Sequence, residues 1–237
     1  MEKTLKIGLV IADDAEFAPV SAYCQDKGGK AIRILNRPAV RYILSGEERK
    51  MEIIAVYCGI GKVNAATLST YLCAVENVNL MVNCGLSGGL SGVCVGEIVV
   101  GTGFVEHDFD LTAIGYAPGE KPGQVSFYEP DVRLTKDFQT KYPCKAGVMV
   151  SGDSFVSDSR KAETLVRRWN AFCCDMETAA IASVCHDFSV PYISIRRISD
   201  GADDQAAKTY QTSVMDKQTW MTLSVKWIES LLNSWEV

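Results

Sequence analysis

The sequence predicts a three-layer αβα sandwich with a central mixed, largely parallel sheet. Short runs that are almost continuously apolar recur along the chain, and such runs are typical of strands covered on both faces. Helical stretches alternate with them, which favours a sheet with helices on both sides. The predicted strands are 6–12, 51–58, 80–84, 97–105, 146–150 and 192–195, and the predicted helices are 63–75, 176–186 and 218–232.

In the first half of the chain, each predicted strand stops at a recognisable signal. The first stops at Asp13 and Asp14. The second and third lead into the glycine clusters 59–62 and 85–89, and the first helix follows the earlier cluster. Glycines allow close approach of backbone to a ligand, and ligands in such sheets bind outside the carboxyl ends of the strands.

In the second half, the fourth predicted strand precedes a long loop at 107–122, a length that is commonly functional or disordered. The fifth leads into 151–156 and the sixth into Arg196. The last helix carries apolar residues at helical spacing, so that face should pack on the sheet. These residues are Trp220, Leu223, Trp227, Ile228 and Leu231.

The composition suits one compact domain over residues 1–237, with 47% hydrophobic and 22% charged residues and no linker-like tract. A net charge of −5 disfavours nucleic acid as a partner, because phosphate binding wants a basic patch. No apolar run is long enough for a membrane span or a signal-peptide core. We therefore expect a cytoplasmic protein with no membrane partner.

Metal binding is not expected either. The nine cysteines have no regular spacing, no Cys-x-x-Cys occurs, and there are only two histidines. A zinc site wants paired ligands at short spacing. Buried, reduced thiols are the better interpretation of the cysteines.

Two adjacent motifs contain residue types that could supply the groups needed for glycosidic cleavage. Met176-Glu177 precedes a helix rich in small residues, and Arg196 stands four residues before Asp200. Glycosidic cleavage needs one carboxylate to bind sugar hydroxyls and another to manage the leaving group. A glutamate in a first helical turn also simply complements the helix dipole. Strand alternation places Arg196 and Arg197 on opposite faces, so only one should enter a site.

The segment Asp13-Asp14-Ala15-Glu16 has two interpretations. It is either a solvated acidic turn or the source of a carboxylate that holds or activates water at the end of a strand.

Taken in order, these motifs resemble those of the methylthioadenosine/S-adenosylhomocysteine nucleosidases, within the purine nucleoside phosphorylase/uridine phosphorylase superfamily. The resemblance runs from Lys6 to the terminal helix and is carried by 59–62, 107–116, 151–156, 174–180 and 196–203. It implies the nucleoside phosphorylase-like fold, a purine nucleoside as the small-molecule substrate, no cofactor and a role in methionine salvage.

The resemblance implies four catalytic residues. Glu16, together with Arg196, would orient and deprotonate the attacking water. Glu177 would accept hydrogen bonds from the ribose hydroxyls and stabilise the cationic sugar. Asp200 would hydrogen-bond or protonate N7 of the leaving purine, which requires a pKa raised by burial.

The resemblance also implies substrate-binding residues. The glycine loops would line the ribose and base, Phe155 would stack on the purine, and the backbone of Val156 would read the base edge. Tyr210 would lie beside the ribose or its 5′ group. The expected residues on the chain's own side are Ile60, Ser87, Gly88, Phe155, Val156, Met176 and Tyr210.

The loop 107–122 would cross a homodimer interface and cap the neighbouring subunit's 5′-substituent pocket. Its apolar lid residues would be Leu111, Ile114, Tyr116 and Pro122. For His107 and Asp108 a structural hydrogen-bonding role is the better interpretation.

Two residues depart from the family pattern. Leu86 stands where many relatives have serine and is followed by Ser87, so a hydroxyl that helps place water is lost or displaced. Asp13 stands where an apolar residue is usual, and it could face solvent or meet a cationic 5′ tail.

The expected activity is hydrolysis of 5′-substituted adenine nucleosides to free adenine and the 5′-substituted ribose. The alternatives are a phosphate-dependent purine nucleoside phosphorylase and a non-catalytic nucleoside-binding protein on the same fold. Phosphorolysis is less favoured, because the glycine loops carry only Lys62 and a phosphate site wants several converging donors.

Overall fold

One mixed sheet organises the protein. The computed structural model describes residues 4–46, 49–213, 217–232 and 234. Within these residues nine strands run in the order β2-β3-β4-β1-β5-β8-β7-β6-β9. Their bounds are β1 Thr4–Ile11, β2 Lys30–Ile34, β3 Arg37–Ser45, β4 Lys50–Tyr57, β5 Leu80–Gly89, β6 Ile98–Glu106, β7 Lys145–Ser151, β8 Ala171–Asp175 and β9 Tyr192–Asp200. The predicted mixed, largely parallel sheet is confirmed.

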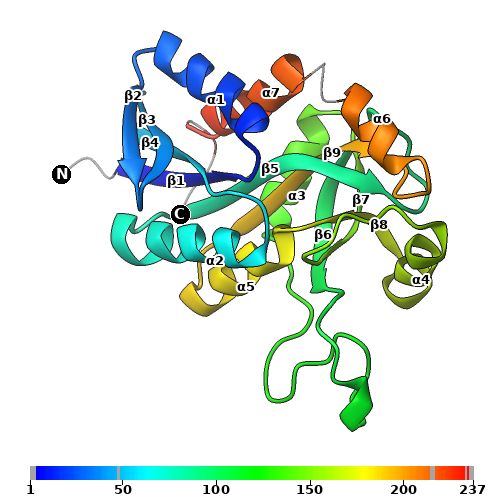
Figure 1. Ribbon diagram of the computed structural model, residues 1–237. Helices are drawn as coiled ribbons and strands as arrows, with labels where there is room; N and C mark the ends of the chain where they lie inside the picture. Colours follow the sequence, from blue (N-terminus) through cyan, green and yellow to red (C-terminus); the bar gives the residue numbers. More distant parts are fainter. Residues whose placement is uncertain (1–3, 47–48, 214–216, 233, 235–237) are drawn as a thin grey trace.

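Helices cover both faces of this sheet, so the three-layer prediction is also confirmed (Figure 1). The helices are α1 Asp14–Asp26, α2 Lys62–Tyr71, α3 Val132–Lys141, α4 Ser159–Trp169, α5 Thr178–Phe188, α6 Ala206–Ser213 and α7 Lys217–Ser230. A single π-helical turn, η1 (Leu72–Glu76), extends α2, and a short 3₁₀ turn, η2 (Thr112–Ile114), lies between β6 and α3.

Alternation along β1 produces two cores. Ile7, Leu9 and Ile11 pack in a core that includes side chains of α1, α3 and α7. Val10 and the following Ala12 point to the other face, into a core shared with α2 and α5. This period-two pattern is why a continuously apolar strand requires cover on both sides.

The sheet closes on itself at one end, which the sequence did not predict. β5 pairs in parallel with β9 as well as antiparallel with β8, so β5, β8, β7, β6 and β9 form a ring. The pairings carry β5 through to Gly89 and β9 through to Asp200. The glycine cluster 85–89 and the stretch from Arg196 to Asp200 therefore lie inside strands, and their assignment to loops was wrong.

Other boundaries also differ from the sequence prediction. The helix expected from residue 176 begins at Thr178, with Glu177 at its N-cap position. The strands β2, β3 and β8 and the helices α1, α3, α4 and α6 were not predicted. β8 is only five residues long, and α1 contains Pro19 with little segregation of apolar residues, so neither has a strong pattern.

The segment between β6 and α3 projects from the body of the molecule (Figure 1). Lid residues Ile114 and Tyr116 are exposed on it, at 70% and 37% of their surface. Among the described residues, no helix has the length and apolar character that a membrane span requires.

Candidate active site

A pocket of about 300 Å³ lies where β1, β5, β8 and β9 end. This volume is at the lower end for small-molecule sites. It gathers all four predicted catalytic residues and all seven binding residues expected from the chain's own side. They are Glu16, Ile60, Ser87, Gly88, Phe155, Val156, Met176, Glu177, Arg196, Asp200 and Tyr210.

Glu16 enters the pocket from the first turn of α1. Its side chain is buried, and Oε1 accepts the N–H of Leu86 at 2.8 Å. Burial raises the pKa of Glu16 to about 7, although this hydrogen bond and the charge of Arg196 act in the opposite direction. A carboxyl group with a pKa near neutrality is suited to general-base chemistry.

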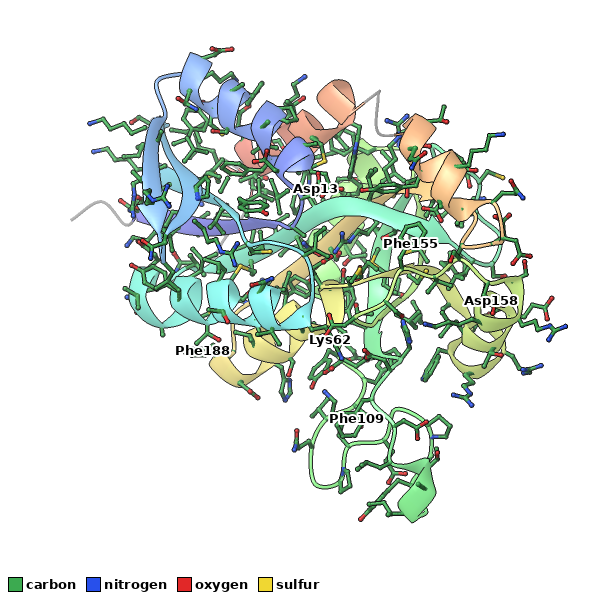
Figure 2. The ribbon with its side chains drawn as sticks, viewed as in Figure 1. Asp13, Lys62, Phe109, Phe155, Asp158 and Phe188 are labelled. Carbon is green, nitrogen blue, oxygen red and sulfur yellow. The ribbon has the colours of Figure 1, made fainter. Side chains whose placement is uncertain are left out.

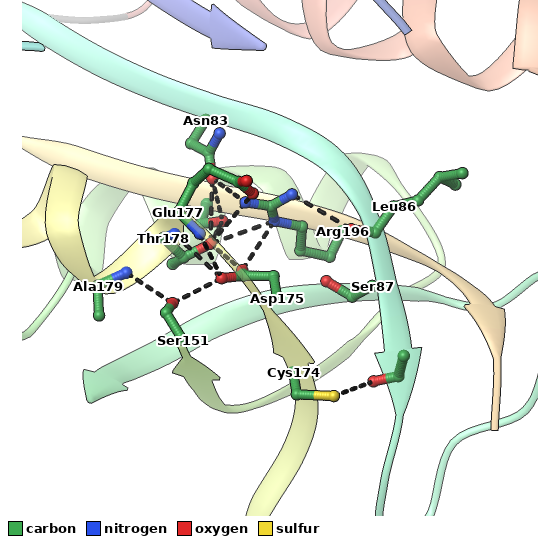
Figure 3. A network of polar contacts seen from close by, with 12 residues as sticks. Asn83, Leu86, Ser87, Ser151, Cys174, Asp175, Glu177, Thr178, Ala179 and Arg196 are labelled. Carbon is green, nitrogen blue, oxygen red and sulfur yellow. Dashed lines mark hydrogen bonds and ion pairs between the residues drawn. The ribbon is translucent and has the colours of Figure 1, made fainter. Parts of the chain in front are cut away.

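Arg196 is fully buried among carboxylates (Figure 3). Its Nε lies 3.1 Å from Asp175 Oδ2, and its Nη2 lies 3.6 Å from Glu177 Oε2. Burial works against the charged guanidinium, but these carboxylates raise its pKa. Arg197 is only half-buried and does not line the pocket, as strand alternation predicted.

A polar network behind Arg196 was missed by sequence reasoning (Figure 3). Asp175 accepts hydrogen bonds from the Ser151 hydroxyl at 2.6 Å and from the Thr178 hydroxyl. The guanidinium also donates to Thr178 and to the amide oxygen of Asn83. The one available signal was an aspartate at the end of an apolar stretch, two residues before Glu177.

Glu177 stands at the N-cap of α5 without capping it. Its side chain instead reaches across the pocket wall, where Oε1 accepts the N–H of Gly61 at 2.9 Å. Burial raises the pKa of Glu177 to about 7, against the lowering effect of Arg196. The N-cap position keeps the carboxylate out of the helix and free to face a ligand, which the first-turn interpretation did not foresee.

Asp200 ends β9 and is buried. Its Oδ1 accepts the N–H of Ala202 at 2.9 Å, and its Oδ2 accepts the Ser199 hydroxyl at 2.7 Å. Burial raises the pKa of Asp200, while these hydrogen bonds lower it. The net upward shift is the direction that a proton donor requires.

Aromatic side chains border the same pocket. Phe155 follows β7 and remains 47% exposed, with its ring edge-on to Tyr210 at a centroid distance of 5.7 Å (Figure 2). Val156 is buried beside it, and Met176 lies between β8 and α5. An exposed ring on a pocket wall is available to stack on a flat heterocycle.

The four lid residues do not reach this pocket. Leu111, Ile114, Tyr116 and Pro122 lie on the projecting segment, away from the pocket of their own chain. Their predicted contact with a neighbouring subunit stays a prediction.

The departures Asp13 and Leu86 both line the pocket. Asp13 is the N-cap of α1, and its Oδ1 accepts the N–H of Ala15 at 2.9 Å. Leu86 contributes backbone rather than a hydroxyl, since its N–H binds Glu16 and its carbonyl accepts from Arg196 at 3.3 Å. Among the residues described, no cluster of three or more histidine, cysteine or acidic side chains is arranged to hold a metal ion.

Comparison with known proteins identifies the family of this chain. The model of the phosphorylase superfamily matches residues 6–232. A 5′-methylthioadenosine/S-adenosylhomocysteine nucleosidase of Halalkalibacterium halodurans is 35% identical over 212 residues, which cover 86% of this chain and 89% of the relative.

Solved structures show the same likeness. A futalosine hydrolase mutant of Helicobacter pylori superposes with a TM-score of 0.86 at 26% identity, covering 96% of this chain and all of the other. The methylthioadenosine/S-adenosylhomocysteine nucleosidase of S. pneumoniae, solved with the transition-state inhibitor MT-ImmA, gives 0.85 at 26% identity and the same coverage. This chain belongs to the 5′-methylthioadenosine/S-adenosylhomocysteine nucleosidase family of the phosphorylase superfamily.

Proposed function

We propose that this protein hydrolyses the N-glycosidic bond of 5′-substituted adenine nucleosides, releasing adenine and the 5′-substituted ribose. Methylthioadenosine and S-adenosylhomocysteine are the proposed substrates. The observation that carries the proposal is the convergence of three buried carboxyl groups, Glu16, Glu177 and Asp200, on one pocket that the buried Arg196 also lines. The family membership of the chain supports the same activity.

Asp200 acts on the leaving group. Negative charge develops on the purine as the bond breaks, and a carboxyl group with a raised pKa can donate its proton to N7. Phe155 stacks on the ring and the backbone of Val156 meets its edge. These contacts hold the base while its charge changes.

Glu177 acts on the sugar. Its carboxylate accepts hydrogen bonds from the ribose hydroxyls, and its negative charge stabilises the oxocarbenium-like sugar at the transition state. Glu16 takes the proton of the attacking water. Arg196 favours the ionised form of both glutamates, because its guanidinium lowers the pKa of each, although burial still raises both pKa values to about 7.

Water is favoured over phosphate as the nucleophile. Among the described residues that line the pocket, Arg196 is the one cation, and it is already paired with Asp175 and Glu177. Lys62 is paired with Glu106 and Asp108 instead. Phosphate binding wants several converging donors, and the Glu16 carboxylate would repel the anion.

A homodimer is the proposed assembly, with the segment 107–122 capping the neighbouring pocket. The exposed apolar side chains of Ile114 and Tyr116 support it, because such residues on a projecting segment are typical of a contact surface. The mouth of the pocket would then be completed by a second copy of the chain.

The proposed setting is the cytoplasm, in methionine salvage, with one nucleosidase domain spanning the chain. Nine free cysteines, seven of them buried, support a reducing compartment. The continuity of the sheet through the described residues supports a single domain.

The test is release of the free base from methylthioadenosine, S-adenosylhomocysteine and futalosine by the purified full chain, with and without phosphate. We expect adenine from the first two in phosphate-free buffer. Strict dependence on phosphate would instead identify a phosphorylase. Asp200→Asn should abolish turnover while the protein stays folded, whereas a scaffold that only binds nucleosides would show no turnover to lose.

A further inference from the structure

A chain of hydrogen bonds leads from the pocket to the root of the projecting segment. Glu177 Oε1 accepts the N–H of Gly61 at 2.9 Å, and the next N–H, that of Lys62, is donated to Asp153 Oδ1 at 2.8 Å. The N–H of Asp153 is donated in turn to Asp108 Oδ2 at 2.9 Å. Four segments distant in sequence are thus joined, and the hydrogen-bonded series ends at a proposed catalytic carboxylate.

The side chain of Lys62 adds a second, direct contact between this series of hydrogen bonds and Asp108. Its Nζ lies 2.6 Å from Asp108 Oδ1 and 2.9 Å from Glu106 Oε2, and Lys121 pairs with the other oxygen of Glu106. Lys62 sits at the N-terminus of α2, directly above the projecting segment that carries Phe109 (Figure 2). Burial works against the charge of Lys62, but the hydrogen bonds to Asp108 and Glu106 raise its pKa.

Close packing of the backbone supports these contacts. Gly61 has φ +99°, and a Cβ there would lie 3.1 Å from Asp153 Oδ1. A Cβ on Gly152 would lie 2.5 Å from the His107 ring and 2.9 Å from Asp108 Cγ. Both glycines therefore let these segments approach closely enough for the hydrogen bonds to form.

We propose that Lys62, Asp108 and Asp153 are positioning residues that hold the N–H of Gly61 against Glu177 and so fix the carboxylate that binds the ribose. None of the three lines the pocket, and the mechanism above uses none of them. The inference rests on the proposed hydrolysis, because it assigns a role through Glu177.

The same linkage fixes the base-facing loop. Asp153 is two residues before Phe155, so the hydrogen bonds that hold Asp153 to Lys62 and Asp108 also limit the position of the stacking ring. Misplacement of a substrate-binding group by about 1 Å can cost about 100-fold in rate. Loss of the linkage should therefore lower kcat/KM by about 10- to 100-fold, even though it removes no group that touches substrate.

The first experiment compares Lys62→Met with Lys27→Met. Lys27 is paired with Glu229, and neither residue lines the pocket, so its loss is a control for removal of a paired lysine. Kinetics are measured with methylthioadenosine and its 2′-deoxy counterpart. We expect kcat/KM to fall in Lys62→Met and to stay unchanged in Lys27→Met. The fall in Lys62→Met should be smaller with the 2′-deoxy substrate, because one hydroxyl that Glu177 binds is already missing.

The second experiment uses the different hydrogen bonds that the side chains of Asp153 and Asp108 accept. Asp153 accepts through one oxygen only, so asparagine can replace it and alanine cannot. Asp108 accepts through both oxygens, so asparagine would set an amide N–H₂ against a donor. We expect Asp153→Asn to restore most of the activity lost in Asp153→Ala, and Asp108→Asn to be impaired.

Amide hydrogen exchange over residues 59–62 gives a readout that needs no turnover. We expect faster exchange at Gly61 and Lys62 in Lys62→Met and Asp153→Ala than in the Lys27→Met control. If the wild type releases no adenine, the proposed function fails while this exchange result still tests the linkage. Exchange and kcat/KM both within about twofold of the control would overturn the positioning role.

Discussion

The N–H of Leu86 is hydrogen-bonded to Glu16 Oε1 at 2.8 Å. Leu86, whose side chain lacks the hydroxyl that many relatives have at this position, thus holds the proposed general base through its backbone. The bond does not depend on which side chain stands at position 86. The departure at Leu86 therefore leaves the carboxylate in place and removes only a hydroxyl from the pocket wall.

The activity should fall on the acid side of neutrality. Burial raises the pKa of Glu16 and of Glu177 to about 7, and both must be ionised to act. Below about pH 7 the logarithm of kcat/KM should therefore drop with a slope that approaches about two. A profile of kcat/KM against pH, measured with methylthioadenosine, checks this. A flat profile down to about pH 5 would contradict it.

Replacing Glu16 should stabilise the fold at high pH while it abolishes catalysis. The folded-state pKa of Glu16 is raised, so its contribution to stability is full below the unfolded pKa and is lost as pH rises through about 7. Glu16→Gln removes that loss and keeps an acceptor for Leu86. We expect the free energy of unfolding of Glu16→Gln to exceed that of the wild type by about 1 to 3 kcal/mol at pH 8 and to differ hardly at all at about pH 4.5.

Urea denaturation at the two pH values measures this difference. A variant that is less stable than the wild type at pH 8 would show that the bond from Leu86 and the charge of Arg196 outweigh the cost of burial.

The catalytic carboxylates were predicted from the family resemblance, because the residue pattern alone indicated only acidic segments after strands. Neither source indicated which residues hold these carboxylates in place. The sequence did not indicate that Asp175 is functional. Its role depends on Arg196, which lies on β9 and also donates to Asn83 on β5. The apolar runs did identify the buried strands, because a strand covered on both faces has a continuous apolar run in its own sequence. The closure of β5 against β9 leaves no such local pattern, because it depends on pairing between strands distant in sequence.

Gly85→Ala should disable the site. A Cβ at this position would lie 2.4 Å from Arg196 Nη1 and 3.1 Å from Glu16 Oε2, so the guanidinium must move. We expect kcat/KM to fall by about 100-fold or more, measured by adenine release. Gly28→Ala is the control, because Gly28 has φ +89° with nothing near its Cβ. That variant carries backbone strain alone and should keep its activity per folded molecule.

Asp175→Asn should cost both stability and turnover. The aspartate is paired with Arg196 at 3.1 Å, and both side chains are almost fully buried. Breaking a buried pair leaves an uncompensated charge and costs about 3 to 5 kcal/mol. The exposed Arg133, which is paired with Asp131, offers a contrast, since Arg133→Met should change the free energy of unfolding by less than about 1 kcal/mol. Equal effects in urea denaturation would contradict this assignment.

Phe155→Ala should weaken substrate binding and leave the fold intact. The ring is 47% exposed and touches Tyr210 edge-on, so its removal opens no buried cavity. Stacking on a base is worth about 1 to 3 kcal/mol, and its loss should raise KM about 5- to 100-fold with a smaller change in kcat. Phe155→Tyr keeps the ring face and should restore binding. If Phe155→Ala left KM unchanged, Phe155 would not be the residue that stacks on the purine.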